Sequence, residues 1–188
     1  MRSFYMVRHG ETSTNLKRIA TGQMDVSLTE NGVNQATDCK RIIHAKGIQP
    51  DIIICSGLKR TKETADIINE DLNCPLYQYA DLNEQHYGDW EGLSWDIVLP
   101  KIEKYGENPP GGESQKTFID RINRSFTKLL DQYSGTILFI THAGVFKTLF
   151  LKYGLNAENV KSGILYELKF SETNLSLLDV IKHESNNL

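Results

Sequence analysis

The sequence contains few cysteines, and those it has lie far apart. Cys39, Cys55 and Cys74 are odd in number and include no Cys-x-x-Cys pair. This pattern argues against a disulfide framework and a structural zinc site, and it favours a reducing compartment. A chain of 188 residues can bury a core without such links. We therefore expect a cytoplasmic protein that forms a single domain over residues 1–188.

Long apolar runs and an excess of positive charge are also missing. No segment approaches the roughly 18 apolar residues of a membrane span, and the N-terminus lacks the apolar stretch of a signal peptide. Lys and Arg total 21 against 24 Asp and Glu, which gives a formal net charge of −3. Proteins that bind nucleic acid in bulk carry clustered positive charge instead. We therefore expect neither a membrane nor bulk nucleic acid as a partner.

The apolar residues that are present form short runs of strand length. The segments 52–55 and 136–141 are almost continuously apolar, as in parallel strands that are covered on both faces. Further strands are expected over 4–7, 164–170 and 175–181, with a turn at Asn174 between the last two.

Helical periodicity fills the spaces between these strands. Thr29 can cap a helix that carries Val33 on its inner side, and Gly47 ends it. Further helices are expected over 59–72, over 114–133 and directly after Gly144. Strands that alternate with helices predict a layered α/β domain.

One long irregular stretch, about 81–113, interrupts this alternation. It holds both tryptophans, Trp90 and Trp95, a possible short helix over 94–105 and a Pro/Gly-rich segment at 108–112. Long excursions inside a compact domain are often functional. The stretch is therefore expected to form the wall that selects a substrate, the alternative being a variable surface insertion.

Cationic side chains follow three of the expected strands at the point where each strand ends. Arg8 and His9 follow the first strand, Arg60 follows 52–55, and His142 follows 136–141. The carboxyl ends of parallel strands meet at one sheet edge, where ligands bind. Guanidinium groups match phosphate oxygens bidentately. The cluster therefore predicts a phosphate site, with Glu84 close by in the excursion.

The ordered motifs resemble those of the histidine phosphatase superfamily, which includes cofactor-dependent phosphoglycerate mutases and related small phosphatases. The matching segments are Arg8-His9-Gly10-Glu11-Thr12, the stretch 22–32, Ser56 to Arg60, Leu82-Asn83-Glu84, Pro110 to Ser114, and Thr141-His142-Ala143-Gly144. Together they span about residues 4–151, with Ala143 where Gly is often found. The resemblance implies a three-layer α/β/α sandwich with a mostly parallel central sheet.

The resemblance also implies catalytic roles. His9 would be the nucleophile that accepts the phosphoryl group, because covalent catalysis divides one difficult displacement into two easier ones. Arg8, Arg60 and His142 would hold the phosphoryl oxygens, a role that suits a protonated His142. Glu84 would protonate the leaving oxygen and then activate water.

Other positions match the family less directly. Asn15 and Thr12 are expected to contact the phosphate, and Gly22 and Thr21 the substrate. Weaker candidates for the general acid are Glu11, Glu91 and Glu113. Neither a cofactor nor a metal is implied, and arginines beside the histidines would repel the cation of a zinc site.

Other phosphatase chemistries fit the sequence less well. Only four residues separate Cys55 from Arg60, where a cysteine phosphatase has five, and neither an Asp-x-Asp pair nor a P-loop motif occurs. We expect a phosphomonoesterase of the small phosphatase branch, acting on a small phosphorylated metabolite. The short spacing from Glu84 to Gly112 favours it over a phosphoglycerate mutase, and the presence of both His9 and Glu84 disfavours a non-catalytic phospho-ligand binding domain.

Overall fold

The computed structural model describes residues 2–154, 160–170 and 177–183 of the chain. Its strands are β1 (Arg2–Arg8), β2 (Ile52–Ser56), β3 (Leu76–Tyr79), β4 (Ile137–Thr141), β5 (Leu165–Phe170) and β6 (Leu177–His183). They form one sheet in the order β3-β2-β4-β1-β5-β6. The pairs β2–β3, β2–β4 and β1–β4 are parallel, whereas β1–β5 and β5–β6 are antiparallel. The sheet is therefore mostly parallel, as expected.

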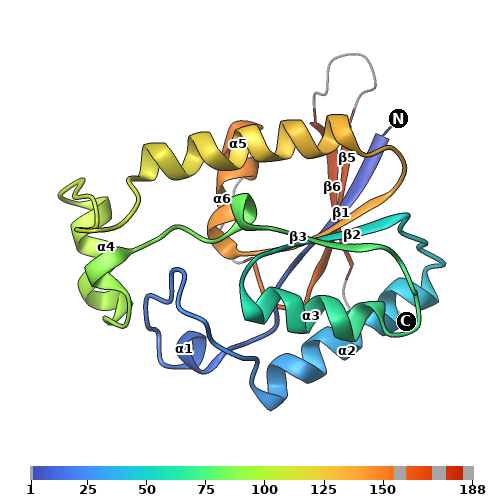
Figure 1. The fold of residues 1–188 in the computed structure, drawn as a ribbon, viewed down its shortest axis with the longest axis horizontal. Helices are drawn as coiled ribbons and strands as arrows, with labels where there is room; N and C mark the ends of the chain where they lie inside the picture. The colour runs from blue at the N-terminus through green and yellow to red at the C-terminus, as the bar shows by residue number, and fades with distance from the viewer. Residues whose placement is uncertain (1, 155–159, 171–176, 184–188) are drawn as a thin grey trace.

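Helices cover both faces of this sheet. The helices are α1 (Ser13–Leu16), α2 (Glu30–Ala45), α3 (Lys59–Asn69), α4 (Trp95–Glu103), α5 (Gln115–Gln132) and α6 (Ala143–Lys152), with 3₁₀ turns η1 (Ala80–Leu82) and η2 (Gly88–Trp90). In Figure 1, α2 and α3 lie below the sheet and α5 above it, while α4 stands apart at the left. None of the described helices is long and apolar enough to cross a membrane.

The alternation of side chains along β4 builds the two cores. Ile137 and Phe139 belong to the core beneath α5 and α6, and Leu138 and Ile140 belong to the core beneath α2 and α3. Successive side chains of a strand point to opposite faces, so a strand that is covered on both sides must be apolar throughout. This arrangement confirms the three-layer α/β/α sandwich.

The expected elements occur with small changes at their ends. Thr29 caps α2 by accepting a hydrogen bond from the backbone N–H of Gly32 at 3.0 Å. Val33 was expected on the inner side of α2 but is 42% exposed, because it lies in the first turn, away from the sheet-facing stripe. The expected turn at Asn174, with the start of the strand expected over 175–181, lies outside the described residues.

Two elements were not expected from the sequence. The helix α1 has one turn, too short to show a helical period. Strand β3 lies at the edge of the sheet and is only partly buried, so it lacks the apolar run of a central strand. Neither element changes the layers, and α1 begins immediately after the first motif.

Candidate active site

The parallel strands β1, β2 and β4 end at the same edge of the sheet and bring the expected cationic residues together. Arg8 is in register with Thr141, the residue before His142, and α3 places Arg60 beside them. Arg8, His9 and Arg60 border a cavity of about 200 Å³, here called the phosphate cavity, whereas His142 is fully buried and is not part of the described lining. The lining of the cavity consists of Arg8, His9, Asn15, Thr21, Gly22, Arg60, Glu84, Tyr87, Trp95 and Ala143.

The His9 imidazole is oriented by the residue that follows it. Nδ1 lies 2.7 Å from the carbonyl oxygen of Gly10. Because a carbonyl oxygen can only accept, Nδ1 carries the proton, and Nε2 of the neutral ring keeps its lone pair. The side chain is buried, and this burial, together with the charges of Arg60 and Arg8, holds the pKa of His9 well below its usual range. The His9 ring is therefore neutral at pH 7, with an unprotonated Nε2.

His142 lies beside His9, with ring centroids 5.2 Å apart. Its Nε2 is 2.7 Å from the hydroxyl oxygen of Ser56, whereas its buried Nδ1 has no hydrogen-bond partner. Burial and the positive charge of Arg60 keep the pKa of His142 well below its usual range. The protonation expected for its phosphate-holding role is thus not favoured by the protein's own groups, and a bound dianion would have to supply it.

Arg8 and Arg60 bring positive charge to the phosphate cavity. Among the described residues, no carboxylate forms an ion pair with either guanidinium. Arg60 is 2% exposed and donates to the carbonyl oxygens of Gly22 at 2.7 Å and Met24 at 3.0 Å. Arg8 donates to the carbonyl oxygen of Val160 at 2.7 Å. The Nε atoms of both arginines are buried and have no hydrogen-bond partner. Burial lowers the pKa of Arg60 to about 10, so its guanidinium still carries its charge at pH 7.

Asn15 reaches the phosphate cavity because Thr12 holds it. The Thr12 side chain caps α1. The backbone N–H and the hydroxyl of Thr12 both donate to Oδ1 of Asn15, at 3.0 and 2.9 Å. The donor end of the Asn15 amide is therefore left for a ligand. Thr12 itself is fully buried and is absent from the described cavity lining, unlike Asn15 and Thr21.

Gly22 lines the cavity in a conformation that suits glycine. Its φ of +48° lies in the left-handed region, and an added Cβ would come within 2.2 Å of Oε1 of Glu91. The same Glu91 oxygen accepts from the backbone N–H groups of Gln23 at 2.8 Å and Tyr87 at 3.1 Å. Glu91 therefore links two loops, and it is not part of the described lining of the phosphate cavity.

Glu84 presents the carboxylate that lines the phosphate cavity. Its Oε2 accepts from the backbone N–H of Gly144 at 3.0 Å, in the first turn of α6, and its Oε1 accepts from Gln85 at 3.0 Å. These two bonds fix both carboxylate oxygens. Glu84 therefore lines the phosphate cavity together with Arg8 and Arg60.

Arg121, on α5, holds the segment that carries Glu84. Its guanidinium donates to the backbone carbonyls of Asp81 at 2.8 Å and Asn83 at 3.0 Å. The same group is bidentate to Glu113, at 2.9 and 2.7 Å. Glu113 is thus occupied by Arg121, and the Glu11 carboxylate accepts from the Thr29 hydroxyl at 2.8 Å. Of the four candidate carboxylates, Glu84 is the one that lines the phosphate cavity.

Comparison with known proteins identifies the family. A model of the histidine phosphatase superfamily (branch 1) matches residues 4–185. The chain belongs to this superfamily. The adenosylcobalamin/alpha-ribazole phosphatase of Escherichia coli (strain K12) is 30% identical over 165 residues, which cover 82% of this chain and 80% of that protein.

A mutase and a solved structure match over similar lengths. The 2,3-bisphosphoglycerate-dependent phosphoglycerate mutase of Bartonella quintana (strain Toulouse) is 30% identical over 177 residues, 86% of each chain. The structure of YhfR from Bacillus stearothermophilus aligns with a TM-score of 0.81 and 26% identity over 94% of each chain. A mutase and a phosphatase therefore both match most of this chain. Chain length does not distinguish the two activities.

Arg121, which positions this histidine phosphatase-type site, was not singled out from the sequence. Arg121 lies on α5, eight residues after its ion-pair partner Glu113 in the sequence. No local motif marks it. Tyr87 and Trp95 both line the cavity and meet edge to face, with ring centroids 5.2 Å apart. Trp90, expected with Trp95 in the wall, is instead buried in a small core with Ala20 and Val98.

Two further observations bear on alternative chemistries. Among the residues that the structure describes, no group of three or more His, Cys, Asp or Glu side chains is placed to hold a metal ion. The thiol of Cys55 lies inside the core, and burial raises its pKa to about 12. A thiolate nucleophile at this position is therefore disfavoured, in agreement with the spacing argument.

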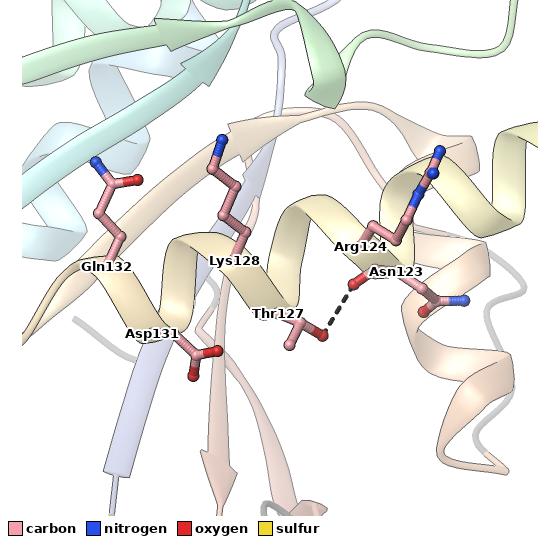
Figure 2. Close-up of a pocket in the computed structure, with 6 residues that line it drawn as sticks. All are labelled: Asn123, Arg124, Thr127, Lys128, Asp131 and Gln132. Atoms are coloured by element: carbon pink, nitrogen blue, oxygen red, sulfur yellow. Dashed lines mark hydrogen bonds between the residues drawn. The ribbon is translucent and has the colours of Figure 1, made fainter.

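Another surface cavity, on α5, shares no lining residue with the phosphate cavity. It measures about 790 Å³ and lies along α5, where Figure 2 shows its six lining side chains projecting from one helix. The dashed line in Figure 2 is a bond within the helix, from the Thr127 hydroxyl to the carbonyl oxygen of Asn123 at 3.0 Å. No histidine is in the described lining of this cavity, whereas the phosphate cavity combines the buried His9 with Arg8 and the buried Arg60.

Gly144 offers a direct test of how Glu84 is held. A Cβ at this position would come within 2.2 Å of Oε1 of Glu84, so Gly144→Ala should displace the carboxylate. We expect kcat on an alkyl phosphate to fall about 10²-fold, because small misplacements of a catalytic group are costly. The unfolding midpoint should change little, since the far end of a flexible side chain can move. Unchanged kcat in this variant would contradict the assigned position of Glu84.

Proposed function

We propose that this protein is a phosphomonoesterase that acts on a small phosphorylated metabolite through a phosphohistidine at His9. The observation that carries the proposal is the His9 Nδ1 bond to the Gly10 carbonyl, which leaves the Nε2 lone pair for attack. Around this nucleophile, Arg8, Arg60 and His142 each hold a buried nitrogen without a hydrogen-bond partner. The guanidinium groups, and the His142 imidazole once a bound dianion favours its protonation, suit the oxygens of a phosphoryl group as donors.

The first step transfers the phosphoryl group to the protein. Nε2 of His9 attacks phosphorus and forms a P–N bond, while the P–O bond to the leaving group breaks. Arg8 and Arg60 bind the phosphoryl oxygens and stabilise the charge that is spread over them in the transition state. Glu84, in its protonated form, donates its proton to the leaving oxygen, and the free alcohol departs.

The second step returns the site to its starting form. Glu84, now a carboxylate, accepts a proton from water as the water oxygen attacks phosphorus, and the P–N bond breaks. The products are inorganic phosphate and a neutral His9. Neither step needs a metal or a cofactor, because the guanidinium groups supply the positive charge and the carboxyl group transfers the proton.

The loop residues support this scheme from outside the reacting atoms. Asn15 would donate its amide N–H to a phosphoryl oxygen, and Thr21 and Gly22 would border the substrate. Thr12 would act as a positioning residue, because it donates two hydrogen bonds to Oδ1 of Asn15 and so orients the amide oxygen away from a ligand. The excursion 81–113 contributes Glu84, Tyr87 and Trp95 to the cavity, which supports its role as the substrate wall.

A phosphoglycerate mutase is the second candidate, since a relative of that name matches 86% of the chain. A mutase must hold the phosphohistidine away from water and bind an intermediate with two phosphates and a carboxylate. The lining beyond the phosphate cavity includes two lysines, Lys147 and Lys152, both exposed. An arrangement with few cations outside the phosphate cavity suits hydrolysis better than transfer to a polyanionic sugar acid.

One pair of rate measurements decides between these functions. The purified protein is assayed in EDTA for hydrolysis of p-nitrophenyl phosphate and, in parallel, for isomerisation of 3-phosphoglycerate in the presence of 2,3-bisphosphoglycerate. We expect hydrolysis without added metal and no isomerisation above background. Isomerisation faster than hydrolysis would contradict the phosphatase assignment.

A further inference from the structure

The orientation of the His9 ring depends on a single peptide unit, the one that joins Gly10 to Glu11. Its carbonyl oxygen, from Gly10, is the group that lies 2.7 Å from Nδ1 of His9. Helix α2 packs directly against this loop, because a Cβ added to Gly10 would come within 2.3 Å of the Gly32 carbonyl oxygen. Whatever holds this peptide unit in place therefore also sets the hydrogen bond that His9 can make.

Gln35, a half-buried residue of α2, binds the other side of the same peptide unit. The backbone N–H of Glu11 donates to Oε1 of Gln35 at 2.8 Å. A backbone N–H can only donate, so the Gln35 amide presents its oxygen here. Two hydrogen bonds thus run in series from Nδ1 of His9, through the peptide unit, to Gln35. Bonds in series polarise one another, so the Gln35 oxygen makes the carbonyl a better acceptor for the His9 proton.

The preceding peptide unit is held separately. The backbone N–H of Gly10 donates to the Thr64 hydroxyl at 3.1 Å, and this hydroxyl donates to the carbonyl oxygen of Arg60 at 2.7 Å. This contact joins the loop to α3. It does not hold the peptide unit whose carbonyl faces His9, whereas the bond from Gln35 does.

We propose that Gln35 is a positioning residue that acts through the Gly10–Glu11 peptide to keep the proton of His9 on Nδ1, so that the Nε2 lone pair can attack phosphorus. This inference rests on the proposed phosphatase function and adds to it a residue outside the described lining of the phosphate cavity. A neutral imidazole carries its one proton on either nitrogen, and the hydrogen bonds of the ring decide which. Without Gln35, the Glu11 N–H loses its acceptor and the peptide unit is free to rotate. His9 then also populates the tautomer with a protonated Nε2, which cannot attack.

The first test replaces Gln35 by methionine, which has a similar shape but lacks the acceptor oxygen. We expect kcat/KM for p-nitrophenyl phosphate to fall on the order of 10-fold, because the nucleophile is misplaced for part of the time. This ratio reports on phosphoryl transfer to His9, the step that releases p-nitrophenolate. The inhibition constant of inorganic phosphate should not change, since Arg8 and Arg60 keep their own carbonyl partners.

The second test observes the tautomer directly, without substrate. Nitrogen NMR is recorded on protein labelled with ¹⁵N in its histidines, and the His9 signals are those that disappear in His9→Asn. The wild-type protein should show a protonated Nδ1 and an unprotonated Nε2. The variant Gln35→Met should show both tautomers of His9.

Two further variants separate positioning from a loss of packing. Gln35→Glu keeps an oxygen that can accept from the Glu11 N–H, so it should retain the wild-type tautomer and most of the activity. Asn34→Met is the matched control, because Asn34 is the neighbouring residue on α2 and is exposed. It should leave kcat/KM and the His9 signals unchanged. Gln35→Leu repeats the test with a side chain of different shape, and the unfolding midpoint is measured for every variant.

The outcomes distinguish the role of Gln35 from the proposed function. An unchanged His9 tautomer in a folded Gln35→Met or Gln35→Leu protein would overturn the positioning role and leave the phosphatase intact. Equal losses of kcat/KM in Gln35→Glu and Gln35→Met would also overturn it, because the acceptor oxygen would then be irrelevant. A mixed tautomer with unchanged kcat/KM would instead support the contact with His9 and contradict the proposed function of His9 as the nucleophile.

Discussion

Replacement of His9 by asparagine should abolish phosphatase activity, with kcat reduced by at least about 10⁴-fold, as for other catalytic nucleophiles. The Asn amide can still donate to the Gly10 carbonyl that accepts from His9 Nδ1 at 2.7 Å, so the buried site should keep its shape. What is lost is the Nε2 lone pair. Steady-state hydrolysis of p-nitrophenyl phosphate measures the effect, and circular dichroism checks that the variant is folded.

A second histidine variant provides the matched control. His44 is on α2, where its ring lies 3.8 Å from Asp71, and it lines none of the cavities described above. The variant His44→Ala should hydrolyse p-nitrophenyl phosphate at the wild-type rate. Substantial turnover by a folded His9→Asn protein would require another nucleophile and would refute the mechanism.

Replacement of Glu84 by glutamine should separate the two chemical steps. A primary alkoxide is a poor leaving group and needs a proton, so hydrolysis of an alkyl phosphate should fall by about 10² to 10⁴-fold. p-Nitrophenolate leaves without protonation, so its release in the first turnover should persist as a burst. The steady rate that follows should be slow, because the variant also lacks the base that activates water.

Glu91→Gln is the matched control for this experiment. One oxygen of Glu91 accepts both the Gln23 and the Tyr87 N–H, and a glutamine oxygen can accept the same two bonds. This variant should therefore retain most of its activity on both substrates. Equal losses for alkyl and p-nitrophenyl esters in the first turnover of Glu84→Gln would contradict the role of Glu84 as the general acid.

Much of the fold could be predicted from the sequence because its central strands are apolar on both faces. The segments 52–55 and 136–141 have this pattern, and they became β2 and β4 in the middle of the sheet. Edge position has the opposite effect: β3 is half solvated, and its sequence Leu76-Tyr77-Gln78-Tyr79 carries no comparable signal. The one-turn α1 likewise depends on the Thr12 cap rather than on a repeating pattern.

The charged part of the candidate site could also be predicted, since strand ends of a parallel sheet meet whatever their distance in sequence. That geometry brought Arg8 and His9 to one cavity with Arg60, from the first turn of α3, and it placed His142 beside His9. The positioning of Glu84 was not accessible in the same way. It depends on Arg121, whose bonds to the carbonyls of Asp81 and Asn83 join segments about 40 residues apart without a local sequence signature.

The same limit applies to the residues around the substrate. Trp90 and Trp95 look equivalent in the sequence, yet one is buried in a small core and the other lines the phosphate cavity. Their difference arises from η2 and from the start of α4, where the Trp95 N–H donates to the carbonyl of Arg18 at 2.8 Å. Such long-range backbone contacts decide which side chains face a ligand.

The central claim is that the phosphoryl group passes through Nε2 of His9, and trapping the phosphoenzyme tests it most directly. The wild-type protein is mixed with ³²P-labelled p-nitrophenyl phosphate, and the reaction is quenched in alkali within milliseconds. Peptide mass spectrometry then identifies the residue that carries the phosphoryl group. The account predicts an acid-labile, alkali-stable phosphoramidate on His9, absent from His9→Asn. Two results would contradict the account. One is hydrolysis without any phosphoenzyme and with inversion of configuration at phosphorus, and the other is a label on a residue other than His9.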